Sequence, residues 1–290
     1  EGFPVGPEHP TLRAMPRFGP AGQQIAYRVH AGPPGAPPIV LQHGFTASAA
    51  SFLSNIHDLA GHFTVVTVEL LGHGDSDAPA DVEPYRPGPA CARLAGLFDH
   101  LGYDRVLLCG HSLGAALALR FALDCPGRLA GLIVMNSSSA AGTPAWRERA
   151  RGGMREMARR VREHGVDVIR GTPLYPAASR RLPPEAKAAI ERDFARLQPE
   201  GIAGTAEGLT IEVNAFERRG ELTVPTLVII GDRDRPFVEA APAFLGALPG
   251  EYVATVTIQG AGHAANLEQP GPFREAVVAF ARQIGYLDPD

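Results

Sequence analysis

The sequence predicts an α/β protein in which helices flank a mostly parallel sheet and a helical insertion lies late in the chain. Short apolar runs, typical of strands buried on both faces, alternate with helix-forming stretches in the first half of the 290 residues. Residues 137–220 carry no strand signal, and strand signals return after residue 220. A chain of this length has room for one large domain or for one domain with an insertion.

The expected elements follow one another along the chain. Strands are expected at 25–29, 39–42, 64–69, 105–109, 129–135, 226–230 and 252–258. Helices are expected at 91–101, 115–123 and 272–284, the last of them amphipathic. Strands that alternate with helices favour parallel pairing, because a parallel pair needs a long crossover between its strands.

The composition is that of an ordinary globular protein. The formal net charge is −4, from 27 Lys and Arg against 31 Asp and Glu, and 45% of the residues are hydrophobic. No apolar run is long enough to cross a membrane, and no charged segment precedes an apolar one at the start, so we expect no membrane association. No basic stripe with interleaved aromatic residues is present, so we expect no nucleic-acid partner.

The three cysteines, Cys91, Cys109 and Cys125, are odd in number, and Cys109 lies in an expected buried strand. Free thiols in a reducing compartment fit this pattern better than a disulfide framework, so we expect a cytoplasmic protein. The spacing of the cysteines does not fit a zinc site, and we expect no bound metal.

A serine set between glycines follows one of the expected strands. The stretch Gly110-His111-Ser112-Leu113-Gly114 leaves the chain only a few residues in which to turn from strand to helix. A Cβ at either glycine would crowd the strand or helix passing close by, and so sharp a turn holds the hydroxyl of Ser112 out at its apex. This G-x-S-x-G pattern predicts a nucleophilic Ser112 if other segments supply a base, an acid and an oxyanion site. An ordinary strand-to-helix connection is the alternative.

A serine hydroxyl is a weak nucleophile near neutral pH, so it needs a base to take its proton and a third group to orient that base. His263 lies in a glycine-flanked loop after an expected strand, within IQGAGHAANLEQP. Asp232 and Asp234 follow another expected strand, within LVIIGDRDRP. Serine, acid and histidine therefore come at strand ends in that chain order.

Five motifs resemble those of the α/β-hydrolase superfamily, in its serine-nucleophile branch, and come in the family's order. They are HGFTAS, VELLGHGDSD, GHSLGA, GDRDRP and GAGHAANLEQP. The motifs extend over most of the chain. The resemblance implies the α/β-hydrolase fold, with the hydrolase core at residues 1–136 and 221–290 and a helical cap, or lid, at residues 137–220.

The resemblance also implies which residue is the acid. Asp234 is the last residue of G-x-x-D and is assigned as the acid that orients His263, while Asp232, otherwise a turn-forming residue, is kept as the alternative. The other location that family members use for the acid holds Asn136, which carries no charge. The resemblance also implies that the segment LLGHGDSDAP is a turn that shapes its loop and supplies no catalytic residue.

Attack on a carbonyl creates an oxyanion that needs two preorganised donors. The backbone N–H of Leu113 is one candidate, because it follows Ser112 at the start of a helix. By the family pattern the other is the N–H of Phe45, in the loop after His43 and Gly44. His43, Gly44 and His111 are also candidates for the substrate pocket. A structural role in holding its loop is the alternative for His43, and packing beneath the pocket is the alternative for His111.

The insertion at residues 137–220 differs in charge from the rest of the chain. It holds 14 Arg and one Lys against 11 acidic residues, although the whole protein is negative. One interpretation is that its positive field attracts an anionic substrate. The other is that its arginines face water or pair with acids at helical spacing.

The serine of the G-x-S-x-G pattern limits the classes of reaction that the resemblance allows. By resemblance, serine at this position excludes the dehalogenases and epoxide hydrolases of the superfamily, which carry aspartate there. The chain resembles the menaquinone-pathway SHCHC synthase in the segments HGFTAS, ELLGHGDSD and TPLY. That synthase has an arginine at the position of Ala116 and tends to have a tyrosine at the position of His111. The carbon–carbon bond hydrolases of aromatic degradation also resemble the chain, but often have a tryptophan at the position of Ala264.

We therefore expect a serine hydrolase that cleaves a small or medium carboxylic ester, thioester or lactone through an acyl-enzyme on Ser112. Its partner is a small-molecule substrate, and the mechanism needs no cofactor. Carbon–carbon bond hydrolysis, elimination of the SHCHC-synthase kind and a weakly catalytic ligand receptor stay open as alternatives. The sequence carries no signal for the oligomeric state.

Overall fold

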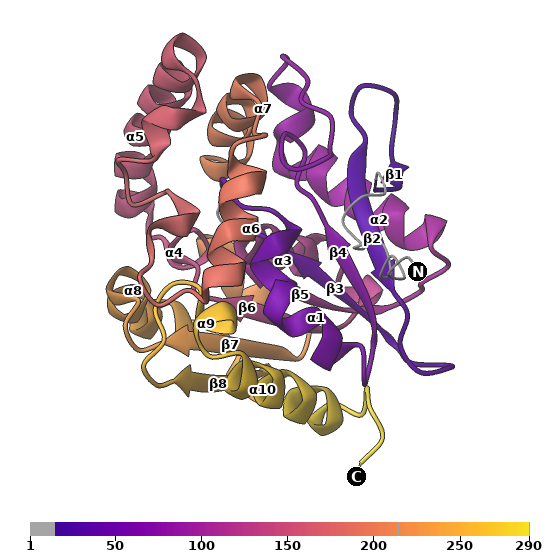
Figure 1. The fold of residues 1–290 in the computed structure, drawn as a ribbon. Coiled ribbons are helices and arrows are strands. Elements are labelled where there is room, and N and C mark those ends of the chain that lie inside the picture. Colours follow the sequence, from indigo (N-terminus) through magenta and orange to yellow (C-terminus); the bar gives the residue numbers. More distant parts are fainter. Residues whose placement is uncertain (1–14, 214, 290) are drawn as a thin grey trace, which may run out of the picture.

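The computed structural model describes residues 15–213 and 215–289, which build an eight-stranded sheet in the order β1-β2-β4-β3-β5-β6-β7-β8 (Figure 1). The strands are β1 (Arg17–Phe18), β2 (Ile25–His30), β3 (Pro38–Gln42), β4 (Thr64–Val68), β5 (Val106–His111), β6 (Leu129–Met135), β7 (Thr226–Gly231) and β8 (Val253–Ile258). From β4 to β8 every neighbouring pair is parallel, whereas β2 is antiparallel to both β1 and β4. The predicted mostly parallel sheet is confirmed.

Helices connect the strands. The α-helices are α1 (Leu53–Leu59), α2 (Pro87–His100), α3 (Leu113–Asp124), α4 (Ser138–Ala141), α5 (Pro144–His164), α6 (Pro184–Phe194), α7 (Pro199–Gly204), α8 (Arg235–Leu245), α9 (Ala265–Glu268) and α10 (Pro270–Gln283). A π-helical turn, η7 (Thr205–Thr210), continues α7. Short 3₁₀ helices are η2 (Ala49–Phe52), η3 (Glu83–Tyr85), η4 (Pro126–Arg128), η5 (Val166–Ile169), η6 (Pro176–Ala178), η8 (Phe216–Glu221) and η9 (Gly250–Tyr252). Among the described helices, none has the length and hydropathy needed to cross a membrane.

Two apolar cores lie on the two faces of the sheet. Alternate residues of a strand enter different cores, as the two-residue period of a strand requires: Val40 packs in one core and its neighbours Ile39 and Leu41 in the other. Residues of α2, α3 and α8 complete the first core, and residues of α1, α9 and α10 complete the second. Because both faces are covered, the central strands β3, β5, β6 and β7 are apolar over most of their length rather than alternating with polar residues.

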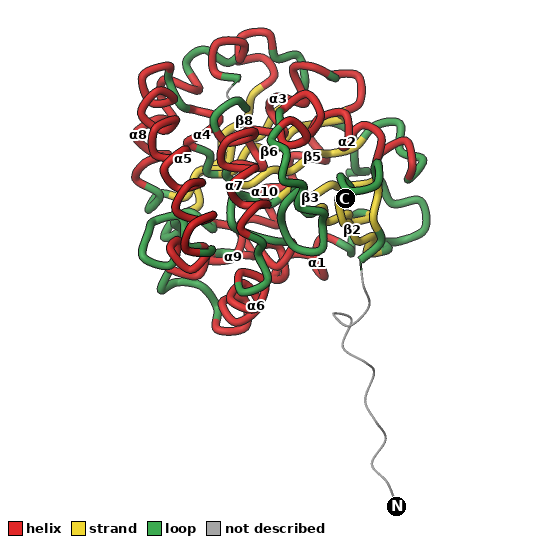
Figure 2. The backbone as a smooth tube through the Cα atoms, turned by 90° about the horizontal axis from the view of Figure 1, so that it is seen from above, coloured by secondary structure: helices red, strands yellow, loops and turns green. Residues whose placement is uncertain are grey.

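Between β6 and β7 the described residues form helices and turns and contain no strand. In both views α5 and α7 lie side by side, and together with α6 they form a layer over the strands (Figures 1 and 2). This layer has a small apolar core of its own, which includes Met157, Val161, Phe194 and Ile202. The division of the chain into a hydrolase core and a cap stays a prediction.

Candidate active site

The chain reverses sharply at Ser112, between β5 and α3. Every residue of β5 is buried, and Ser112 follows it with φ 54° and ψ −119°, a conformation that side-chain-bearing residues rarely adopt. The Ser112 N–H donates to Met135 O at 3.0 Å, and the Ser137 hydroxyl donates to Ser112 O at 2.6 Å. The backbone of β6 and the side chain of Ser137, two residues beyond its end, thus hold the strained turn in place.

The two glycines of the G-x-S-x-G turn, Gly110 and Gly114, stand where a side chain has no room. A Cβ on Gly110 would lie 2.4 Å from Gly114 O, and a Cβ on Gly114 would lie 2.3 Å from Gln42 O. These atoms belong to the backbone and cannot swing away. The clash that the sequence predicted at both glycines is therefore confirmed, and it explains why β3, β5 and α3 pack so closely around Ser112.

We expect Gly114→Ala to lower the free energy of unfolding by about 1–3 kcal/mol, because overpacking forces backbone shifts. Gly152→Ala is the matched control: Gly152 lies in α5, and a Cβ there meets no atom within 4 Å. In a helix interior alanine is favoured over glycine by about 0.5–1 kcal/mol, so the control should be slightly more stable than wild type. Urea unfolding of the three proteins measures both effects, and equal midpoints for the two variants would contradict the clash.

His263 and Asp234 meet where β7 and β8 end. The His263 Nδ1–H donates to Asp234 Oδ2 at 2.8 Å, and since Nδ1 carries the proton the neutral ring keeps a lone pair on Nε2. The Asp234 side chain is 6% exposed, whereas that of His263 is 53% exposed. Asp232 makes no such contact with His263; its carboxylate lies 3.8 Å from Arg233 Nε.

Asn136 connects the two loops that carry His263 and Asp234. It is fully buried, adopts φ 43° and follows β6. Its Nδ2 donates to Gly262 O at 2.6 Å and His263 O at 3.0 Å, and its Oδ1 accepts from the Gly231 N–H at 2.8 Å. Asn136 carries no charge, and these contacts give it a positioning role for both loops.

Ser112 and His263 line one cavity of about 190 Å³. The other lining residues come from the loops after β3 and β8 and from the segments between β6 and β7; they are Gly44, Phe45, Ala47, Ser51, His111, Pro173, Leu174, Tyr175, Pro176, Ala178, Ser179, Ile190, Ala264, Asn266 and Leu267. Asp234 is absent from the described lining and reaches the cavity only through His263.

Two backbone amides near Ser112 are available as donors. Within residues 15–213 and 215–289, neither the Phe45 N–H nor the Leu113 N–H donates a hydrogen bond to the protein. Phe45 lines the cavity, and Leu113 begins α3, where the free amides and the helix dipole favour negative charge. The loop of Phe45 is fixed by the next residue, Thr46, whose N–H donates to His73 Nε2 at 3.1 Å and whose hydroxyl donates to Leu174 O at 2.6 Å.

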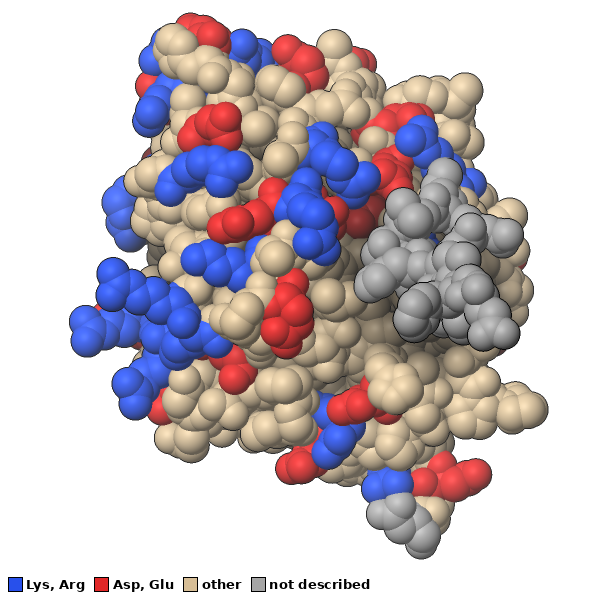
Figure 3. Space-filling model, in the orientation of Figure 1, with Lys and Arg blue, Asp and Glu red and all other residues tan. Residues whose placement is uncertain are grey.

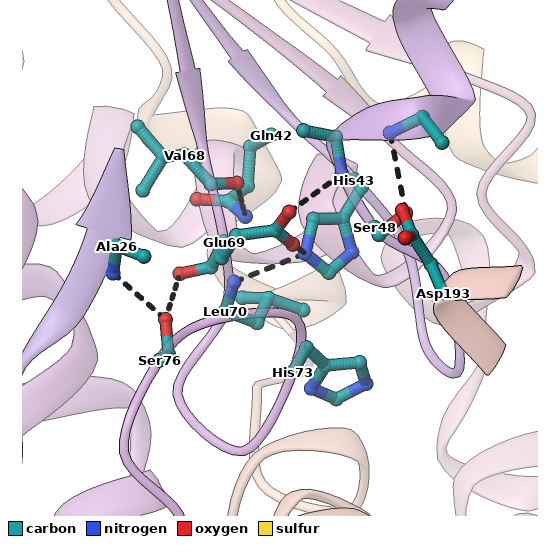
Figure 4. A network of polar contacts seen from close by, with 12 residues as sticks. Ala26, Gln42, His43, Ser48, Val68, Glu69, Leu70, His73, Ser76 and Asp193 are labelled. Atoms are coloured by element: carbon teal, nitrogen blue, oxygen red, sulfur yellow. Dashed lines mark hydrogen bonds and ion pairs between the residues drawn. The ribbon is translucent and has the colours of Figure 1, made fainter. Parts of the chain in front are cut away.

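His43 lies behind this loop, in a buried polar network with Glu69 (Figure 4). Its Nδ1–H donates to Gly44 O at 2.8 Å, and its Nε2 lies 2.8 Å from Glu69 Oε2 and 3.0 Å from the Leu70 amide nitrogen. The described cavity lining includes Gly44 and His111, which were expected there. His43 was expected there as well, but it is not part of the described lining. The reason is that both of its ring nitrogens are engaged within the wall.

Buried Glu69 is a residue that the sequence analysis missed. Its Oε1 accepts from the Ala49 N–H at 3.0 Å, on the far side of the loop that contains Phe45. Ser48 adds a contact from this loop to α6, since its hydroxyl donates to Asp193 at 2.6 Å. A glutamate at the end of a strand gives no sequence signal for such contacts, because its partners lie about 20 residues away along the chain.

Two further histidines are buried and neutral. Burial lowers the pKa of His73 to about 3, with a contribution from nearby His43, and burial likewise lowers the pKa of His111 to about 3. His111 Nε2–H donates to His263 O at 2.7 Å, so His111 adds to the contacts of Asn136 with the same carbonyl. Neither ring carries charge near neutral pH.

Eight of the 14 arginines of the insertion pair with acids: Arg147, Arg151, Arg159, Arg162, Arg170, Arg181, Arg196 and Arg218. Arg162 reaches Glu200 at 3.0 Å and Glu207 at 2.9 Å, and Arg170 reaches Asp167 at 2.8 Å. Figure 3 shows basic and acidic side chains interspersed over much of the face that it presents, with one cluster of basic side chains at its left edge. In the described residues the cavity lining contains neither Lys nor Arg. These observations favour the interpretation of solvent-facing, paired arginines over that of a field directed at the substrate.

The fold and the site together define the class of protein. The sheet is mostly parallel, Ser112 lies at a strand-to-helix turn, and a histidine and an acid lie at the ends of later strands. The chain belongs to the alpha/beta hydrolase fold family, whose model matches residues 37–270. The resemblance found from the sequence motifs is thereby confirmed.

Three similar proteins cover nearly the whole chain. A putative 2-succinyl-6-hydroxy-2,4-cyclohexadiene-1-carboxylate synthase of Bacillus subtilis (strain 168) is 27% identical over 87% of this chain and 93% of its own. 3-Oxoadipate enol-lactonase 2 of Acinetobacter baylyi is 28% identical over 86% of this chain and 90% of its own. The structure of a thermophilic esterase from Thermogutta terrifontis matches with a TM-score of 0.77 and 27% identity, over 90% of this chain and 94% of that one.

Proposed function

We propose that this chain is a serine hydrolase that cleaves a small or medium carboxylic ester, thioester or lactone through an acyl-enzyme on Ser112. The observation that carries the proposal is the contact of His263 with buried Asp234 beside a cavity whose wall also holds Ser112. Similarity to an esterase and to an enol-lactonase supports the same reaction class.

In this proposal the proton moves between Ser112 and His263. His263 Nε2 takes the Ser112 proton as Oγ attacks the carbonyl carbon, and the Asp234 carboxylate stabilises the imidazolium that forms. The imidazolium then protonates the leaving alcohol or thiol, which leaves an acyl ester on Ser112. Water attacks that ester with the same base, and the acid departs as Ser112 regains its proton. The tautomer with Nδ1–H facing Asp234 supports this route.

The tetrahedral oxyanion would be held by the N–H groups of Phe45 and Leu113. Both are without a protein acceptor in the described chain, as donors reserved for a reacting oxygen must be. Gly44 supports the placement, because a Cβ there would lie 2.8 Å from Ser112 Cβ. A side chain at this position would therefore force the donor loop and the nucleophile apart.

The segment 137–220 would act as the cap that selects the substrate, with 1–136 and 221–290 as the core; residues 1–14 and 290 of that core and residue 214 of that cap lie outside the described residues. Leu174, Tyr175 and Ile190 supply one side of the cavity. Contacts such as Thr46 with Leu174 support a cap seated directly on the donor loop.

Elimination of the SHCHC-synthase kind, to which the sequence motifs also pointed, is the second candidate, because the same base could remove a proton from carbon. Similarity to the Bacillus protein named as a putative 2-succinyl-6-hydroxy-2,4-cyclohexadiene-1-carboxylate synthase favours it. The cavity supports it less well. Its described lining has no Lys or Arg to bind a carboxylate, and the residue four positions after Ser112 is the buried Ala116.

A panel of p-nitrophenyl esters from acetate to dodecanoate, together with fluorophosphonate labelling, tests the proposal. A cavity of about 190 Å³ is smaller than the roughly 300–1,000 Å³ of drug-sized pockets, so we expect turnover to be fastest with short and medium acyl chains. The fluorophosphonate adduct, located by mass spectrometry of peptides, should lie on Ser112. Labelling without cleavage of any ester would overturn the proposal in favour of elimination, carbon–carbon cleavage or ligand binding.

A further inference from the structure

A buried carboxylate, that of Glu268, joins the loop of His263 to the insertion between β6 and β7. Glu268 is the last residue of α9, and its side chain is 1% exposed. From the loop, the Gly262 N–H donates to Glu268 Oε2 at 2.7 Å. From the insertion, Arg181 Nε donates to the same oxygen at 2.6 Å, and the Ser179 hydroxyl donates to Oε1 at 2.9 Å. One carboxylate therefore holds both segments.

The contact with Glu268 is the charged one among the described hydrogen bonds of the backbone at Gly262 and His263. Asn136 Nδ2 donates to the carbonyl oxygens of both residues, and His111 Nε2–H donates to His263 O. These donors are neutral amide and imidazole groups. A hydrogen bond to an ionised acceptor is shorter and stronger than one between neutral groups. Glu268 is therefore a main constraint on the backbone from which the His263 ring projects.

The guanidinium of Arg181 balances the charge of this carboxylate. A carboxylate removed from water is costly unless a counter-charge and hydrogen bonds compensate it. Among the described residues, Arg181 is the only cation that forms an ion pair with Glu268, and its own side chain is 52% exposed. Gly262 permits the approach, because a Cβ there would overlap the guanidinium. Arg181 can therefore reach water without Glu268, whereas Glu268 depends on Arg181.

We propose that Arg181 is a positioning residue for the base: it acts through Glu268 to hold the His263 backbone where the imidazole contacts Asp234 and faces the cavity. This inference rests on the proposed function, because it adds a residue to the same reaction. Ser179 also donates to Glu268, and it lines the cavity. The insertion that forms part of the cavity wall and the loop that carries the base are thus joined at one carboxylate. Only a seated insertion aligns the base.

Arg181→Gln should lower kcat for the fastest p-nitrophenyl ester by about 10- to 100-fold, since misplacing a reacting group by ~1 Å costs about 100-fold. Without its counter-charge the Glu268 carboxylate would turn toward water and release the Gly262 N–H. We expect KM to change by less than about 3-fold, because ground-state binding of the ester is untouched. Rates are counted per active site titrated with the fluorophosphonate, which removes any loss of folded protein. The rate of Ser112 phosphonylation should fall in parallel, because that step uses the same base.

Arg218→Gln is the matched control. Arg218 also lies in the insertion and forms an ion pair with the core, at 2.7 Å from Asp124, and its side chain is 41% exposed. The same charge is lost from the same segment, but the described contacts of Arg218 do not involve the loop of His263. Ion pairs between solvent-exposed groups contribute little, so kcat should stay within about 3-fold of wild type. A loss as large as that of Arg181→Gln would overturn the proposal in favour of a general effect of charge.

Substitutions of Glu268 test whether Arg181 acts through this carboxylate. Glu268→Gln keeps an oxygen for the Gly262 N–H but has no charge to balance, so it should retain most of kcat. Adding Glu268→Gln to Arg181→Gln should restore kcat to within about 3-fold of Glu268→Gln alone, because the two sites are coupled. Glu268→Ala removes the acceptor and should lose about as much kcat as Arg181→Gln. A double variant no faster than Arg181→Gln would mean that the arginine acts by another route, and would overturn the proposal.

The outcomes separate the two proposals. If wild type neither cleaves an ester nor is labelled at Ser112, the proposed function fails and the positioning role fails with it. If wild type reacts but Arg181→Gln keeps kcat within about 3-fold, or is impaired in KM alone, only the positioning role is overturned. Should Arg181→Gln fail to fold, the other variants decide: near-normal kcat in Glu268→Ala, or a double variant far slower than Glu268→Gln, overturns the proposal.

Discussion

Replacing Ser112 with alanine should lower kcat for a short p-nitrophenyl ester by about 10⁴- to 10⁶-fold and abolish fluorophosphonate labelling. Without Oγ no acyl-enzyme forms, and His263 has no hydroxyl proton to take. The residual rate would come from binding and from the two oxyanion donors alone. Single-turnover measurement of p-nitrophenol release with a fluorophosphonate gel beside it covers both readouts.

The fold should survive this change. Alanine retains the Cβ that serine already carries at φ 54°, and the contacts that hold the turn involve the Ser112 backbone rather than its hydroxyl. We therefore expect the urea midpoint of Ser112→Ala to match wild type. Ser179→Ala is the control for other serines of the cavity, and it should still be labelled. Labelling that persists in Ser112→Ala, or that disappears in Ser179→Ala, would contradict the assignment.

Much of the fold was predictable because its central strands are apolar over most of their length. The apolar run of β5 and the helix-forming residues of α3 are recognisable from their own residues alone. The predicted strands match β2 to β8 within one or two residues at each end. The helix α8 was missed: it contains Pro242, which local preference places outside helices. Pro242 removes one hydrogen bond from the helix, and the packing of Phe237 and Phe244 into the core offsets that loss.

Features that depend on distant contacts had no local signal. The π-helical turn η7 follows a point where Gly201 meets Gly72, since a Cβ on Gly201 would lie 2.4 Å from Gly72 O. These two glycines are far apart in sequence, and neither segment alone indicates the approach. Strand β1 is two residues long and was missed for the same reason, because its pairing with β2 defines it.

Some residues of the candidate site were predictable from the sequence, and others were not. Motif order pointed to Ser112, Asp234 and His263, because each lies at the end of its own strand and carries a recognisable chemistry. Asn266 could not be found from its motif, since its partners Ser51 and Asn55 lie more than two hundred residues earlier in the chain. These contacts form only when distant parts of the chain come together, so no local pattern encodes them.

Asp234→Asn is expected to lower kcat by about 10⁴-fold with little change in substrate KM. Asparagine has nearly the shape of aspartate but no charge, so it no longer stabilises an imidazolium at His263. Its amide can also donate to Nδ1, which would place the proton on Nε2 and leave the ring unable to accept the Ser112 proton. Steady-state kinetics on the fastest ester of the panel measures the loss.

Asp232→Asn is the matched control, because Asp232 lies two residues away and makes no contact with His263. The same charge is removed from the same loop, so a general effect of net charge or of loop stability would appear in both variants. We expect Asp232→Asn to keep kcat within about tenfold of wild type, a change of about 1.4 kcal/mol in the barrier. A loss in Asp232→Asn as large as that in Asp234→Asn would instead mean that the loop as a whole, rather than the carboxylate facing His263, limits the reaction. Near-normal turnover of Asp234→Asn with loss in Asp232→Asn would move the acid to Asp232.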